Sequence, residues 1–250
     1  FMQPGPRTTN RKASLDHLVL GSDGTFGKID YDVAFGQGIS KVTNSDKNYV
    51  ATDLFVAAIN DGSIDPTRTD NPEALIDAIR LTPKRAGKSV TRFVDGKVSG
   101  PILDLPGGPL QYAVGFQLVK ESLTDRPDAQ SQAGNVFGSI AQAAVDANRT
   151  HKGLFAELAI PITKTLEAQV AVRRDQYPGQ GQTSPKVAMK WTPASSFAVR
   201  ASYAESFLAP SLKQLYGGQD EGAESTSDPV ICAAFPTISG TCSNFPYKEI

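Results

Sequence analysis

The sequence lacks the apolar run that a membrane-spanning helix needs. Nowhere do roughly 18 apolar residues follow one another, so no transmembrane helix is predicted. A membrane β-barrel would leave no such run either, because its apolar residues alternate with polar ones. The formal net charge of −1 gives no electrostatic reason to expect a nucleic-acid partner.

Histidine is equally scarce, and its placement argues against an enzyme. His17 falls in a weak strand pattern, and His151 is expected in a loop before a strand. A catalytic or metal centre needs histidine, acid and nucleophile to converge, and no such convergence is indicated. The two Gly-x-Gly sequences, at 36–38 and 179–181, do not open helices and are not phosphate cradles. We therefore expect no catalytic residue, no metal site and no cofactor.

The sequence has only two cysteines, Cys232 and Cys242, in a loop rich in Gly, Ser, Thr and Pro. Two thiols without a nearby histidine do not make a zinc site. A local disulfide formed in an oxidising compartment fits this spacing better, and two unpaired loop thiols remain the alternative.

What the sequence does contain is period-2 alternation of apolar and polar residues. Such alternation places apolar side chains on one face of a β-strand. It predicts all-β structure, with strands at 11–21, 27–43, 91–103, 110–121, 150–162, 165–176, 184–193 and 196–205.

The connections between these strands are expected to alternate in length. Short turns are predicted at 22–25, 104–109, 163–165 and 192–195, with a medium loop at 177–183. Long loops are predicted at 44–90, 122–149 and 206–250. Within the first of them, Asn71 is the expected N-cap of a short helix that has Pro72 at its first position. Both ends of the sequence look cut, as in an internal fragment of a longer protein.

The two faces of the predicted strands differ in a way that separates two architectures. A secreted, soluble all-β binding or structural protein would bury its apolar face and place its polar face in water. A transmembrane barrel turns the apolar face to lipid and the polar face to a wet lumen. The second face is too polar to form a dry core, and the long loops gather at one end, so the barrel is favoured. The residues that make this face polar are Glu157, Glu167, Gln169, Arg173, Lys186, Lys190 and Arg200.

Four segments are distinctive: residues 104–115, the strands at 155–161 and 184–191, and above all residues 199–216. They resemble the TonB-dependent receptors of the Gram-negative outer membrane. In the family this last segment usually reads as a strand followed by Phe-Arg-Ala-Pro-Ser, and here Leu208 replaces the arginine. The resemblance is strong over 100–217 and weaker over 11–60.

The resemblance implies that residues 1–250 form about eight strands of a 22-stranded, antiparallel, up-and-down transmembrane β-barrel with long extracellular loops. It also implies a separate plug domain in the lumen, outer-membrane lipid around the wall, and energy from an inner-membrane TonB–ExbB–ExbD complex. The imported extracellular solute would be scarce and large: a siderophore–iron chelate, a cobalamin or an oligosaccharide.

The lumen-facing cations Arg173, Lys190 and Arg200 are the candidate substrate contacts. The alternative is that they only face water and one another across strands. Trp191 and Phe197, which flank the turn at 192–195, are expected in an aromatic girdle at the membrane interface.

Overall fold

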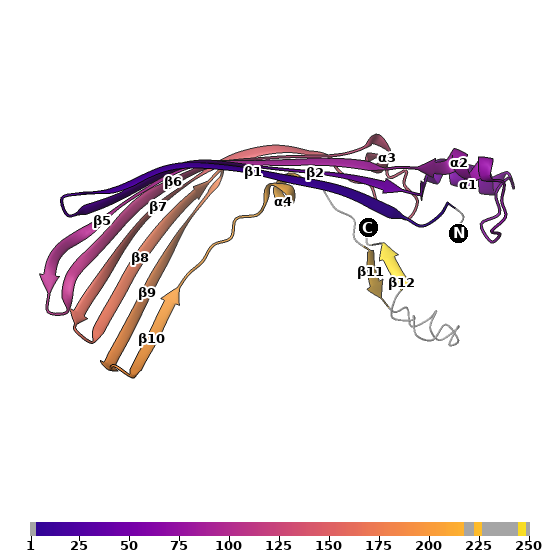
Figure 1. Cartoon of the computed structure of the whole chain (residues 1–250). Helices are drawn as coiled ribbons and strands as arrows, with labels where there is room; N and C mark the ends of the chain where they lie inside the picture. The colour runs from indigo at the N-terminus through magenta and orange to yellow at the C-terminus, as the bar shows by residue number, and fades with distance from the viewer. Residues whose placement is uncertain (1–3, 218–222, 227–244, 249–250) are drawn as a thin grey trace.

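A computed structural model of the chain describes residues 4–217, 223–226 and 245–248 (Figure 1). Its main feature is one curved, antiparallel sheet of eight strands in the order β1-β2-β5-β6-β7-β8-β9-β10. The strands are β1 (Thr8–Phe26), β2 (Ile29–Lys47), β5 (Lys84–Leu105), β6 (Gly108–Pro127), β7 (Val145–Thr163), β8 (Leu166–Tyr177), β9 (Gln180–Ala194) and β10 (Phe197–Ala204). Each pairs with its sequence neighbour in the sheet, which confirms the predicted up-and-down order.

The sheet is arched rather than closed, and β1 and β10 have a neighbour on one side only among the described strands. Side chains on its concave face crowd together, because curvature brings them closer. Along β7, for example, the residues of one face are buried or half-buried from Val145 to Glu157, and those of the other face are exposed.

The strands are longer than their hydrophobic alternation predicts. The long connections are therefore shorter than expected, running over 48–83 and 128–144 instead of 44–90 and 122–149. Beyond the apolar part of each strand the outward-facing residues are mostly polar, and the few apolar residues, such as Leu123, Val145 and Ala147, lie on the opposite face. The backbone ladder continues there, but the period-2 hydrophobic signal is weak.

Two predicted connections are wrong in detail. Residues 22–25 lie inside β1, and the chain turns at Gly27-Lys28, where Gly27 has φ +66°. The medium loop at 177–183 is a tight turn at Pro178-Gly179, with Gly179 at φ +79°. Glycine adopts this left-handed conformation at little steric cost. The position of such a glycine therefore locates the turn more accurately than a stretch of turn-favouring residues does.

The convex face carries the apolar alternation as a continuous band. Directly paired residues share a face of the sheet. One such row runs through Val98, Val114, Ala156 and Val172. Large apolar side chains in this band remain exposed, including Phe116 at 44% and Leu154 at 62%.

The upper limit of the band steps across the sheet. The last large apolar residue before the long loops is Ile39, Val90, Leu118, Leu154 and Val172 on β2, β5, β6, β7 and β8 in turn. By register, Leu154 lies two residues below Leu118, and Val172 lies two residues below Leu154.

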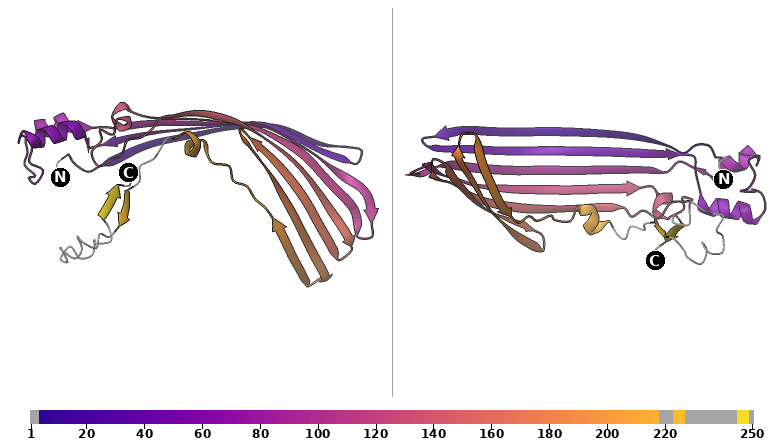
Figure 2. Two further views of the ribbon diagram at one scale, coloured as in Figure 1. Left: turned by 180° about the vertical axis from the view of Figure 1, so that it is seen from behind. Right: turned by 90° about the horizontal axis from the view of Figure 1, so that it is seen from below.

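The connection between β2 and β5 folds into a small cap at the long-loop end of the sheet (Figure 2). It contains β3 (Tyr49–Val50), α1 (Thr52–Asn60), α2 (Glu73–Ile79) and β4 (Arg80–Leu81). Its core consists of Val50, Phe55, Ala58, Ile64, Ile76 and Ile79. The Phe55 ring meets Phe137 of the next long connection edge-on at 5.0 Å, so the two connections pack together.

The predicted helix in this cap exists, but its predicted N-cap is wrong. The N-cap of α2 is Pro72. The Asn71 side chain instead accepts a hydrogen bond from the Asp65 N–H and donates one to the Asp65 carbonyl, at 2.8 and 2.9 Å. Asn71 therefore holds the preceding loop closed.

The remaining described elements are short. They are α3 (Ala129–Gln132), α4 (Leu212–Tyr216) and the hairpin of β11 (Ala223–Thr226) and β12 (Phe245–Lys248). Asp128 caps α3 by accepting from the Ser131 N–H at 2.8 Å. Cys232 and Cys242 lie outside the described residues, so their disulfide stays a prediction.

Candidate functional site: the concave face of the sheet

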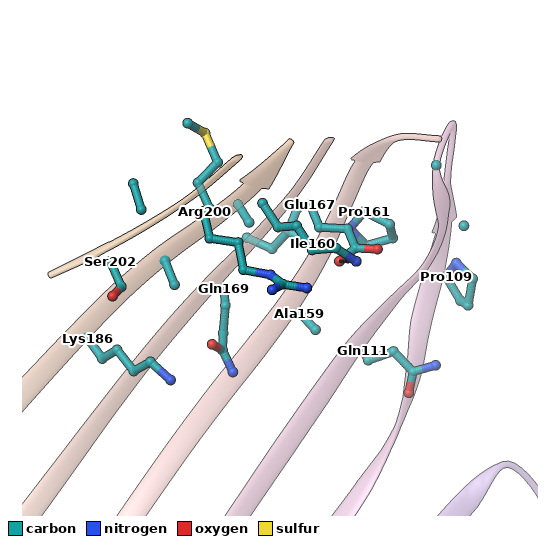
Figure 3. Close-up of a pocket in the computed structure, with 17 residues that line it drawn as sticks. Pro109, Gln111, Ala159, Ile160, Pro161, Glu167, Gln169, Lys186, Arg200 and Ser202 are labelled. Carbon is teal, nitrogen blue, oxygen red and sulfur yellow. Dashed lines mark hydrogen bonds and ion pairs between the residues drawn. The ribbon is translucent and has the colours of Figure 1, made fainter. Parts of the chain in front are cut away.

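The concave face contains a hollow of about 700 Å³ near the short-turn end of β6 to β10 (Figure 3). Polar side chains from neighbouring strands project into it because period-2 geometry aims every second residue at this face. They are Gln111, Glu167, Gln169, Lys186, Lys190, Arg200 and Ser202. Small residues such as Ala159 and Ala188 form its floor and leave the space open.

Two of the three predicted candidate residues, Lys190 and Arg200, line this hollow. They are directly opposite each other on β9 and β10. The Lys190 ammonium lies 3.4 Å from Glu167 Oε2, so one acid offsets part of their charge. A large, wet hollow with more cations than acids could accommodate an anionic group of a partner domain or a solute.

The third candidate, Arg173, lies apart from the hollow. It forms an ion pair with Asp175 at 2.7 Å and donates to Gln117 Oε1 at 3.1 Å. Arg173 is thus engaged within the wall, by Asp175 of its own strand and Gln117 of β6. The structure does not bring the three predicted cations together.

A second group of side chains sits on the same face, closer to the long loops. The Arg149 guanidinium lies over the Tyr177 ring, 5.1 Å from its centroid, and pairs with Glu121 at 2.6 Å. The His151 ring stacks on the Tyr177 ring, with centroids 4.6 Å apart. Phe207 meets Tyr177 edge-on at 5.9 Å. We call these five residues the mouth cluster.

The mouth cluster holds the segment that follows β10 against the concave face (Figure 1). Arg149 donates to the carbonyl of Pro210, 61 residues further along the chain. The helix α4 then begins with a capping box between Ser211 and Gln214. Leu212 of α4 is buried against Val145 and Ala147. The segment 205–217 is thereby fixed across the inside of the arch.

Sequence reasoning missed this cluster because it placed Arg149 in the long loop 122–149 and His151 just before a strand. The structure places His151 within β7, which begins at Val145. The signal is present in the sequence, since Val145, Ala147, Arg149 and His151 continue the odd-numbered face. It is weak because only two of these four residues, Val145 and Ala147, are apolar.

Arg149→Gln is expected to loosen segment 205–217 without unfolding the sheet. The change removes a charged hydrogen bond and a half-buried ion pair. It should lower the free energy of local opening of this segment by about 1.5 kcal/mol. Hydrogen exchange of the amides in 211–217 should therefore accelerate roughly tenfold, since 1.4 kcal/mol is a factor of ten.

Arg126→Gln is the matched control for this change. Arg126 pairs with Asp146 at 3.1 Å, but both side chains are about two-thirds exposed. Exposed pairs contribute little, so exchange in 211–217 should not change. Equal acceleration in both variants would contradict the anchoring role of Arg149.

Other kinds of site are not found in the part of the chain that the structure describes. No group of three or more His, Cys, Asp or Glu residues there could hold a metal ion. None of the described helices has the length and hydropathy to cross a membrane.

Comparison with known proteins gives one extensive match. Residues 3–243 match the family described as TonB dependent receptor-like, beta-barrel. Among solved structures, the chain is similar to one titled "Structure of the RagAB peptide transporter", with a TM-score of 0.48 and 10% sequence identity. That similarity covers 74% of this chain and 20% of the other, so the chain spans about a fifth of that protein's length. No curated protein matches the chain.

Proposed function

The chain belongs to the TonB-dependent receptor-like β-barrel family, and we propose that its sheet is part of the wall of an outer-membrane importer. Extracellular loops would bind a scarce, large solute, and the barrel would admit it. In this proposal the chain supplies scaffold and binding surface and performs no bond chemistry.

The observation that carries the proposal is the exposed apolar band on the convex face. Monomeric soluble proteins rarely expose a continuous apolar surface of this extent. A lipid-facing wall requires one, together with a polar opposite face. The secreted soluble protein considered as the alternative would have to cover the band, and no described segment does so. The segment 205–217 packs against the opposite, concave face.

The open edges of the sheet support a larger barrel. Among the residues that the structure describes, no strand pairs with the backbone N–H and C=O groups on the outer edges of β1 and β10. Such an edge is not tolerated in lipid, so further strands must complete the wall. The family's 22-stranded size is the proposed total.

Two of the proposed partners, lipid and a plug domain, follow from the two faces of the sheet. The energy-supplying complex and the class of solute follow from the family. Outer-membrane lipid surrounds the convex band, and a plug domain occupies the lumen beside the hollow that contains Lys190 and Arg200. The TonB–ExbB–ExbD complex supplies the energy. The solute is a siderophore–iron chelate, a cobalamin or an oligosaccharide. The location is the outer membrane of a Gram-negative bacterium.

Trp191 offers a direct test of the membrane location. It is the only tryptophan of the chain, lies opposite Leu166 and Val199, and is 46% exposed. In the whole receptor inserted into vesicles, brominated acyl chains are expected to quench its fluorescence. Bromine placed near the headgroup should quench more strongly than bromine near the chain end, because Trp191 is close to the short turn.

Comparing wild type with a Trp191→Phe variant separates the fluorescence of Trp191 from that of other tryptophans in the whole receptor. Absence of quenching at either depth in a correctly folded receptor would refute the lipid-facing assignment.

A further inference from the structure

The convex face changes character where the apolar band ends. At and above the upper edge of the band, toward the long loops, the outward-facing residues include six cations on five neighbouring strands. We call this group the basic collar. Its members are Lys41 on β2, Lys88 and Arg92 on β5, Lys120 on β6, Lys152 on β7 and Arg174 on β8, all of them exposed.

The strand register brings collar residues of the same charge face to face. Arg92 is directly opposite Lys120, and Lys41 is directly opposite Lys88. Opposed residues have Cβ atoms about 4.5–5.5 Å apart, and like charges in this position destabilise a sheet. Lys152 and Arg174 continue the series on diagonal positions. An anion between these side chains would relieve the repulsion.

The wall itself does not provide that anion. In the described part of the chain, no collar residue forms an ion pair. Arg92 donates to the neutral Gln37 side chain at 2.6 Å, and Arg174 donates to the Thr183 hydroxyl at 2.9 Å. Cations elsewhere in the wall do have acidic partners, as Lys190 has Glu167 and Arg149 has Glu121.

The collar also follows the edge of the apolar band. Lys41, Lys88, Lys120, Lys152 and Arg174 are each the first outward-facing residue beyond the last large apolar one on their strand, and Arg92 lies between Val94 and Val90. They descend across the sheet with the same stagger as the band. In a bilayer this level is occupied by lipid headgroups, immediately outside the hydrocarbon region.

We propose that the basic collar binds the phosphate groups of lipid headgroups in the leaflet on the long-loop side. Clustered guanidinium and ammonium groups match phosphate oxygens in charge and hydrogen bonding. Lipid acyl chains would lie on the apolar band directly below, so one lipid molecule contacts both surfaces. The inference rests on the proposed membrane location of the band.

The test uses the whole receptor and lipid A, a diphosphorylated glycolipid, with its dephosphorylated form for comparison. Native mass spectrometry measures how much lipid remains bound as lipid concentration is varied. The collar variant combines Arg92→Gln, Lys120→Gln and Lys152→Gln. The matched control combines Lys97→Gln, Lys186→Gln and Arg200→Gln, which removes the same charge from the concave face.

The collar variant should bind lipid A on the order of a hundredfold more weakly than wild type, since each cation near a lipid surface contributes about 1 kcal/mol. The control should bind it as wild type does, and the dephosphorylated lipid should bind weakly to all three. Three outcomes would each overturn the proposal. Lipid A could bind wild type and the collar variant equally well, the control could lose as much lipid A binding as the collar variant, or the phosphorylated lipid could bind no better than the dephosphorylated one. If the triple variant does not insert, Lys120→Gln and Lys152→Gln alone should each weaken binding roughly fivefold.

Trp191 quenching separates this inference from the proposed function. A wild-type receptor that shows no quenching contradicts the membrane location and the collar together. A receptor that is quenched but shows no phosphate preference contradicts the collar alone.

Discussion

Val170→Arg is expected to destabilise the receptor in lipid by about 2–4 kcal/mol, the cost of a cation near the bilayer midplane on the lipid face of a barrel. Val170 lies in the apolar band, opposite Leu158 on one side and Val187 on the other, and is 42% exposed. Leu158 and Val187 offer an arginine at this position no acidic partner. The measurement is the free energy of unfolding in lipid vesicles, from urea titration.

Gln169→Arg is the control, one residue away on the concave face. Gln169 donates a hydrogen bond to Glu157, so an arginine there meets an acid and water. Its effect should stay within about 0.5 kcal/mol, as for most surface changes. Comparable losses in both variants would show that the two faces are wrongly assigned.

Gly36→Val is expected to cost about 3 kcal/mol, at the upper end of overpacking penalties. Gly36 on β2 is directly opposite Phe93 on β5. A Cβ at position 36 would lie 2.3 Å from two atoms of the Phe93 ring, which covers the glycine. The ring cannot stay in place beside a valine, so packing on the concave face is lost.

Two further variants test whether the clash with the Phe93 ring causes this penalty. In a Phe93→Ala background the extra cost of Gly36→Val should fall below about 1 kcal/mol, which a double-mutant cycle of unfolding free energies would measure. Gly87→Val on the same face should be tolerated, because a Cβ there meets only the Val42 carbonyl oxygen at 4.0 Å. A penalty at Gly36 that persists without the ring would mean that its backbone, and not Phe93, requires glycine.

Much of the sheet could be predicted from the sequence. The alternation in 150–204 is a local property of each strand, and it indicated strand order, the two faces and the short turns. The prediction failed where strands leave the apolar band, as in 122–127 and 145–149. Few residues there are apolar, and Leu123, Val145 and Ala147 lie on the opposite, concave face. Local patterns also misplaced the turn at 22–25 and the cap of α2, where the Asn71 side chain binds Asp65 of the preceding loop.

The sequence by itself determined which residues of a strand share a face, because period-2 geometry needs no partner. It could not determine which residues of different strands meet, because register depends on pairing across the whole sheet. Only the tertiary structure therefore decided that Arg149 holds Pro210, and that Arg173 is engaged apart from Lys190 and Arg200. The same register sets Arg92 against Lys120, a pair of like charges that neither strand reveals alone.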